Sequence, residues 1–218
     1  MFSIYIDDMF KELESSGLGC YIGSQFMGVH GYADDVVLLS PDRAGLQRMM
    51  DICIGYCEKH GIQISVDADP KKSKTKTMVF NAKHGKPANI MINNTPVPWT
   101  DTYVHLGHNI TSDENMYHDL NAKVGEYYQK VQSLRQEIGD QDPRVFIKLV
   151  SIYFVSFYGS NLWELSNPKS DKLWSTWNNL IRTSYNLPIG THRYILYDVQ
   201  NGEHLQSKIL HKFTNFCP

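Results

Sequence analysis

Two pairs of adjacent aspartates are the side chains of this sequence best suited to chemistry. One pair, Asp34 and Asp35, stands in GYADDVVLLS between a glycine and a strongly apolar run, and the other, Asp7 and Asp8, stands in YIDD near the N-terminus. Charged side chains rarely border such runs unless they are paired, solvated or bound to metal. Two carboxylates that approach one point can hold a divalent cation against phosphate oxygens, which is the chemistry of phosphoryl transfer.

The N-terminal pair fits a structural role. Apolar side chains recur at helical spacing through residues 1–14, and the following SSGLG is typical of a helix end. This pattern predicts an amphipathic helix that carries Asp7 and Asp8 on its solvated side. We therefore expect at most one of the two pairs to be chemical.

The second pair lies in a different pattern. Residues 26–39 contain two β-rich runs with a break at Asp34 and Asp35, which predicts a hairpin. A turn relaxes the alternation of strand side chains, so both carboxylates can approach one point, and Ala33 keeps the surroundings small. An ordinary Asp-Asp β-turn is the alternative, and these residues alone do not decide between the two.

Further elements must position this hairpin. Residues 40–61 predict a helix with Ser40 as its N-cap, Pro41 at its first position and Gly61 at its end. After it we expect, in order, a strand at 62–66, a polar loop at 67–74, a strand at 75–80, a hairpin around Asn93 and Asn94, and a final strand at 102–111. The first 112 residues thus predict an α+β domain with helices packed on one face of an antiparallel sheet.

The remainder of the chain, residues 113–218, predicts a helical module. Apolar residues repeat at helical spacing from Leu120 to Ile138, and Asp142-Pro143 then starts a helix that we expect to run to about Gly159. A third helix is predicted at 170–187, with Ser170 as its cap. Shorter helices are expected at 191–199 and 203–213.

Charge is distributed unevenly, although the net charge is only −2. Six lysines follow the first helix of the α+β domain: Lys71, Lys72, Lys74, Lys76, Lys83 and Lys86. In the helical half, basic and aromatic side chains are interleaved. That mixture suits a nucleic-acid groove, through phosphate contacts and stacking, and equally a helical core with a solvated exterior.

The four cysteines, Cys20, Cys53, Cys57 and Cys217, form no CxxC pair, which indicates a reduced, intracellular setting. Cys53 and Cys57 are expected to pack in the core. No apolar run reaches the length of a membrane span, and the N-terminus lacks the basic region of a signal peptide. We expect a protein of the nucleus or cytoplasm, neither secreted nor bound to membranes.

The order of three segments carries a family resemblance. YADDVVLLSPDRAGLQRMMD, KTKTMVF and YVHLGHNIT resemble, in this order, the later palm of a reverse transcriptase of the non-LTR retrotransposon class, jockey-like elements in particular. Residues 32–40 match the aspartate box, 74–80 a lysine-bearing strand, and 103–111 the primer grip. MFSIYIDDMF is similar to the end of the helix before that box. Residues 157–165 and 187–196 resemble parts of the thumb and connector.

The resemblance implies an RNA-directed DNA polymerase with a partial palm at residues 1–112 and a thumb and connector at 113–218. Its partners would be an RNA template, a DNA primer and deoxynucleoside triphosphates. By this resemblance Asp34 and Asp35 are the catalytic ligands of two Mg²⁺ ions. Lys74 or Lys76 lies near the triphosphate, and the sequence does not choose between them.

The resemblance assigns a further role to Leu106 and Gly107, which brace the primer strand. The family's fingers, its upstream metal-binding aspartate and its endonuclease domain have no counterpart in this sequence. We therefore expect a fragment that is inactive, or nearly so, by itself. A remnant that binds RNA or RNA–DNA duplex without catalysis is the main alternative.

Two alternatives lie outside that family. An unrelated metal-dependent phosphotransferase using Asp34 and Asp35 predicts a second acidic cluster beside an apolar strand, but Asp67 and Asp69 stand in a polar loop. The other alternative is a gene piece with no selected role.

Overall fold

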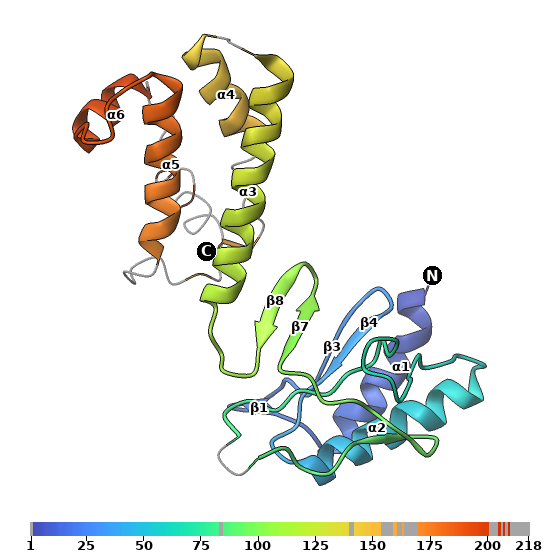
Figure 1. Cartoon of the computed structure of the whole chain (residues 1–218). Coiled ribbons are helices and arrows are strands. Elements are labelled where there is room, and N and C mark those ends of the chain that lie inside the picture. The colour runs from blue at the N-terminus through green and yellow to red at the C-terminus, as the bar shows by residue number, and fades with distance from the viewer. Residues whose placement is uncertain are drawn as a thin grey trace. The chain divides into compact units, whose positions relative to one another are not determined.

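The computed structural model of the chain divides into two compact units, residues 1–102 and 103–218, and each is described by itself (Figure 1). The structure describes residues 2–82, 85–139, 142–153, 159, 160, 163, 170–200, 205, 207 and 209. The sequence places the domain boundary after residue 112, whereas the division falls after residue 102. The hairpin that follows this point packs on a helix of the second unit and therefore belongs with the helices.

The first unit combines two helices with three hairpins. Its elements are α1 (Phe2–Ser15), β1 (Tyr21–Ile22), β2 (Gln25–Phe26), β3 (Val29–Tyr32), β4 (Asp35–Leu38), α2 (Arg43–Lys59), β5 (Met91–Ile92) and β6 (Thr95–Pro96). Asn93 and Asn94 both have positive φ, at 46° and 66°, as a type I′ hairpin turn requires. The predicted helix at the N-terminus and the predicted hairpin around these asparagines are confirmed.

The core of this unit lies between the apolar faces of α1 and α2. Ile6, Met9 and Leu13 are buried on α1 at helical spacing, and they pack with Met49 and Cys53 of α2. Burial raises the pKa of the Cys53 thiol to about 12, so this cysteine is a packing residue. Its predicted place in the core is confirmed.

The N-terminal cap of α2 differs from the prediction. Asp42 is the N-cap, and its Oδ1 accepts a hydrogen bond from Gly45 N at 2.7 Å. Ser40, the predicted cap, instead donates its hydroxyl to the Asp42 carbonyl at 2.9 Å. The chain is still extended at Asp42, with φ −141°, so the helix begins after the predicted cap. At the other end, Gly61 has φ +66°, as the predicted stop requires.

The predicted single sheet is wrong for the described strands, which form four separate two-stranded sheets. The runs 62–66 and 75–80 form no strand; Thr77 makes only an isolated parallel bridge to Trp99. Extending that ladder toward Thr75 would require an N–H at residue 98 to donate to the Thr75 carbonyl, and Pro98 has none. Helices with small antiparallel hairpins nevertheless agree with the α+β class.

The second unit begins with a hairpin and continues as helices. Its elements are β7 (Thr102–His105, whose first residue closes the first unit), β8 (His108–Thr111), α3 (Tyr117–Ile138), α4 (Pro143–Tyr153), α5 (Asp171–Ser184) and α6 (Arg193–Val199). The single strand predicted at 102–111 is therefore two strands joined by a turn. The predicted end of the fourth helix near Gly159, and most of the helix predicted at 203–213, fall outside the described residues.

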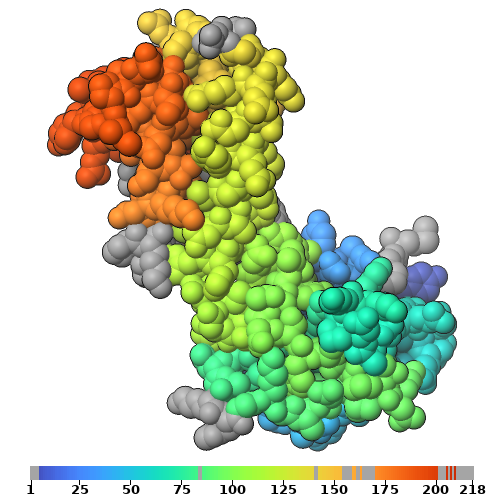
Figure 2. Space-filling model, in the orientation of Figure 1, coloured from blue at the N-terminus to red at the C-terminus, as the bar shows by residue number. Residues whose placement is uncertain are grey.

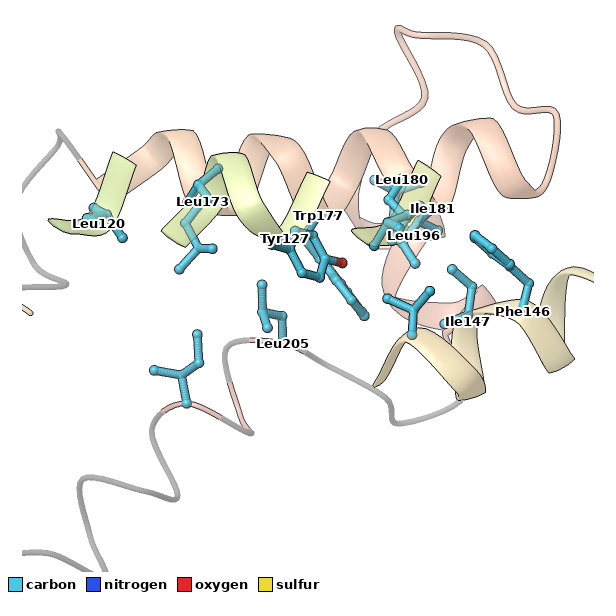
Figure 3. Close-up of a cluster of buried hydrophobic side chains, with 14 of the residues drawn as sticks. Leu120, Tyr127, Phe146, Ile147, Leu173, Trp177, Leu180, Ile181, Leu196 and Leu205 are labelled. Atoms are coloured by element: carbon cyan, nitrogen blue, oxygen red, sulfur yellow. The ribbon is translucent and has the colours of Figure 1, made fainter. Parts of the chain in front are cut away.

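The helices of the second unit share one apolar core. The buried apolar side chains of α3, from Leu120 to Val131, belong to the predicted stripe that ends at Ile138, and α5 contributes Leu173, Trp177 and Ile181. In Figure 3 the α5 side chains point toward residues of α3 and α4. Tyr127 and Trp177 lie 6.5 Å apart between ring centroids. None of the helices in the described ranges is long and apolar enough to cross a membrane.

Candidate functional site

The hairpin β3–β4 carries the first aspartate candidates at its tip. Tyr32 pairs with Asp35, so the connecting loop has two residues, Ala33 and Asp34. Ala33 has φ 55°, a conformation that costs an alanine about 1–2 kcal/mol. A positive φ at the first loop residue is the feature of a type II′ turn, whose twist matches that of hairpin strands. The predicted hairpin is thus confirmed.

Two helices hold the base of this hairpin. Val29 and Leu38, its terminal pair, pack against the core between α1 and α2. Gly31 lies against the ring of Phe10 from α1, and a Cβ on that glycine would lie 2.5 Å from Phe10 Cζ. The missing side chain therefore lets α1 approach the strand closely. The hairpin loop lies toward the N-terminal end of α1 (Figure 1).

Both carboxylates of the tip are exposed. Strand alternation puts Gly31 on the face that α1 covers, and Tyr32 and Asp35 on the opposite face. Neither the Asp34 carboxylate nor the Asp35 carboxylate has a hydrogen-bond or ion-pair partner in the part of the chain that the structure describes. Carboxylate oxygens are the hard ligands that Mg²⁺ prefers, so this donor set fits the expected ion. Within the described ranges no three His, Cys, Asp or Glu side chains form a metal-binding group.

The other aspartate pair is partly neutralised by a lysine of the same helix. Lys11 Nζ lies 2.6 Å from Asp7 Oδ2 and 3.4 Å from Asp8 Oδ1 on the exposed face of α1. The hydrogen bond and charge of Asp7, followed by those of Asp8, raise the pKa of Lys11. The prediction that these aspartates lie on the solvated side of a helix is confirmed.

The lysine-rich segment is a loop organised by its own polar side chains. Ser73 is buried, accepts a hydrogen bond from Asp67 N at 3.2 Å and donates to the Thr75 carbonyl at 2.6 Å. The Asp69 carboxylate accepts from Lys71 N at 2.9 Å. The loop's acidic groups thus bond to its own backbone.

All four lysines of this loop, Lys71, Lys72, Lys74 and Lys76, are exposed. Figure 2 draws the loop in teal at the surface of the first unit. Of the other predicted lysines, Lys86 pairs with Asp101 at 2.9 Å, and Lys83 falls outside the described residues.

The predicted primer-grip residues lie at the tip of the second unit's hairpin. Leu106 and Gly107 form the two-residue turn between β7 and β8, with φ of 46° and 76°. Val104, Leu106 and Ile110 are 62%, 36% and 37% exposed, so the hairpin presents an apolar surface. The structure thus brings Asp34 and Asp35 together in one hairpin, and Leu106 and Gly107 together in another.

A buried carboxylate beneath this second hairpin was not anticipated. Asp119, in the first turn of α3, is 4% exposed and accepts four hydrogen bonds. Its donors are Asn109 N at 2.9 Å, Asn109 Nδ2 at 3.3 Å, Trp163 Nε1 at 3.1 Å and His108 Nδ1 at 3.3 Å. Gly159 packs on the His108 imidazole, and a Cβ there would overlap the ring. Both Gly159 and Trp163 stand in the segment that resembles the thumb, which is the sequence signal for this cluster.

Four hydrogen bonds determine the ionisation of this carboxylate. Burial raises the pKa of Asp119, but the bonds from Asn109, Trp163 and His108 outweigh burial and leave the pKa below its ordinary value. The carboxylate therefore stays charged at neutral pH, and its charge depends on donors from the hairpin.

Comparison with known proteins finds no match: no family model, no curated protein and no solved structure matches this chain. The geometry of the two hairpins and the order of the motifs are therefore the features from which a function can be inferred.

Proposed function

We propose that this chain is the later palm and thumb of a reverse transcriptase of the non-LTR retrotransposon class, an RNA-directed DNA polymerase. The observation that carries the proposal is the tip of β3–β4. There, a two-residue turn with a strained Ala33 exposes Asp34 and Asp35 side by side on a base that two helices hold. Strained backbone is commonest at functional sites, and a plain turn would use glycine at this position.

The two aspartates supply a hard anionic site at the end of a hairpin. Asp34 and Asp35 would hold Mg²⁺ against the triphosphate of an incoming nucleotide, which provides further oxygen ligands. When bound, Mg²⁺ activates the primer 3′-hydroxyl and offsets the negative charge that develops on the phosphates. Asp35 shares its face of the hairpin with Tyr32, which is 68% exposed and can contact a sugar or base placed there.

The other candidate residues bind the nucleic acid and its phosphates. Lys74 or Lys76 neutralises the triphosphate, and the loop that carries them presents its ammonium groups outward. The exposed apolar turn at Leu106 and Gly107 braces the primer strand, where a glycine allows close backbone approach. Because the sequence lacks the family's third metal-binding aspartate, we propose that the chain binds primer–template and extends it poorly.

The test is the affinity for a fluorescent DNA primer annealed to an RNA template, measured by anisotropy. We expect Mg²⁺ with the complementary deoxynucleoside triphosphate to tighten binding by about tenfold relative to chelator. The double variant Asp34→Asn, Asp35→Asn removes this enhancement. The matched control, Asp7→Asn with Asp8→Asn, removes two adjacent aspartates from α1 and retains it.

The outcomes separate the proposal from its main alternative. The alternative, a non-catalytic duplex-binding protein, is favoured if duplex affinity falls steeply with salt but does not change with chelator or with the Asp34 and Asp35 substitutions. A chain that does not bind the duplex contradicts both.

A further inference from the structure

Asp119 is the most fully hydrogen-bonded carboxylate among the described side chains, and the proposed function gives it no role. Three of its four donor groups come from His108 and Asn109 at the start of β8, and the fourth is the Trp163 indole. Asp119 itself belongs to α3. One buried side chain therefore joins the hairpin, the long helix and the segment around residue 163.

A buried charge is stable only when its partners are in place. Removing a carboxylate from water costs several kcal/mol, which hydrogen bonds from well-placed donors must offset. Here three of the four donors belong to the hairpin, so a displacement of β8 leaves the anion with the Trp163 indole as its one remaining donor. The first turn of α3 adds a favourable helix dipole, which holds the carboxylate on the helix side.

The pairing of its two strands holds the hairpin only weakly. A two-stranded hairpin is marginally stable by itself, and β7–β8 pairs with no third strand in the described part of the chain. Val104 and Ile110 leave an apolar surface exposed. The hairpin is held by contacts between β8 and α3, where Thr111 and Asp119 are buried. Gly159 also packs against His108 of β8.

We infer that Asp119 is a positioning residue for duplex binding, which acts by fixing β7–β8 on α3 so that the Leu106–Gly107 turn meets the primer strand. The inference depends on the proposed function, which assigns that turn to the primer. Asp119 contacts neither primer nor nucleotide. It affects duplex affinity by holding the hairpin in position.

The test combines Asp119→Asn with Leu106→Ala in a double-mutant cycle. Asparagine has nearly the same shape but lacks the charge, so Asp119→Asn should weaken binding of the RNA–DNA duplex by about tenfold. In the Leu106→Ala background, Asp119→Asn should have no further effect, because the turn no longer contributes the contact that Asp119 positions. Amide exchange of residues 103–110 should accelerate in Asp119→Asn.

Two further variants complete the experiment. Glu126→Gln removes an exposed carboxylate of α3 and should change neither affinity nor exchange. Trp163→Phe keeps the aromatic ring but removes one donor to Asp119, and should give a smaller loss of affinity with the same dependence on Leu106. If Asp119→Asn does not fold, the duplex affinity of Trp163→Phe and its dependence on Leu106 still test the inference.

Three results would overturn the inference. They are unchanged duplex affinity in both Asp119→Asn and Trp163→Phe, unchanged exchange of the hairpin, and effects of Asp119→Asn and Leu106→Ala that add fully. Absence of duplex binding by the unsubstituted chain would instead overturn the proposed function, and this inference with it.

Discussion

Individual residues in this protein adopt costly conformations or environments at the two hairpins. Ala33 has a left-handed backbone at the tip that carries the aspartates, and Asp119 is a charge buried beneath the other hairpin. The surrounding structure offsets both costs. Strand pairing holds Ala33 in its strained conformation, and four hydrogen bonds compensate for the burial of the Asp119 charge. Both features can be tested by substitution or by pH.

Replacing Ala33 by glycine should raise the free energy of unfolding by about 1 kcal/mol, because glycine adopts positive φ without steric cost. Denaturation in urea measures the effect. The control Ala44→Gly, in the first turn of α2, should instead lower stability by up to about 1 kcal/mol. Loss of stability in Ala33→Gly would contradict the positive φ at that residue.

The low pKa of Asp119 predicts a specific dependence of stability on pH. A carboxylate whose pKa is lower in the folded than in the unfolded state stabilises the fold at pH above its unfolded pKa. This contribution is lost as pH falls from about 3.8, the ordinary value, through the lower folded pKa. Asp119→Asn should therefore flatten the pH dependence of the urea midpoint below pH 4. Parallel curves for both proteins would show that Asp119 is not the group responsible.

At the scale of elements, the sequence predicts single helices and local turns well. The periodic apolar residues of α1, α3 and α5 define buried faces, and the asparagine turn between β5 and β6 has its expected geometry. These predictions succeed because each depends on residues close together in the chain.

Non-local pairing explains the predictions that failed. The run 75–80 has strand-like composition, but Pro98 on the neighbouring segment blocks the ladder on the Thr75 side of its single bridge. The hairpin at 102–111 looks like one strand because Leu106, at positive φ, is not a typical turn residue. Asp119 was missed because its donors come from residues 108, 109 and 163, which only the fold brings together.

The close packing of Gly159 on His108 predicts that one added methyl group strongly lowers the stability of the second unit. Gly159→Ala should lower the free energy of unfolding of the second unit by more than about 2 kcal/mol, because φ is +75° and the new Cβ overlaps the His108 ring. Gly125→Ala, on an open face of α3, should raise stability by about 0.5–1 kcal/mol. Equal effects of the two substitutions in urea denaturation would contradict the packing of Gly159 on His108.

At the scale of the whole molecule, each unit contributes one hairpin tip to the proposed polymerase. The aspartate turn and the lysine loop belong to the first unit, and the apolar turn at Leu106 belongs to the second. Under the proposed function, we predict that binding of the metal ion needs the first unit alone.

Catalytic activity of the chain by itself should be very low. A two-metal site normally uses a carboxylate that bridges the ions, and the upstream aspartate of the proposed family has no counterpart in this sequence. A primer-extension assay with Mg²⁺ and all four deoxynucleoside triphosphates should show at most traces of product. Robust templated synthesis would contradict this expectation and would require a further ligand.

The central claim, that the Asp34–Asp35 turn binds a divalent cation, has a direct test. Fe²⁺ replaces Mg²⁺ at such sites and, with ascorbate and peroxide, cleaves the polypeptide within a few ångströms of the ion. We predict cleavage within residues 29–38, which excess Mg²⁺ and the Asp34→Asn, Asp35→Asn variant suppress and the Asp7→Asn, Asp8→Asn control leaves unchanged. Cleavage elsewhere in the chain, or cleavage at this hairpin that survives loss of both aspartates, would contradict the account.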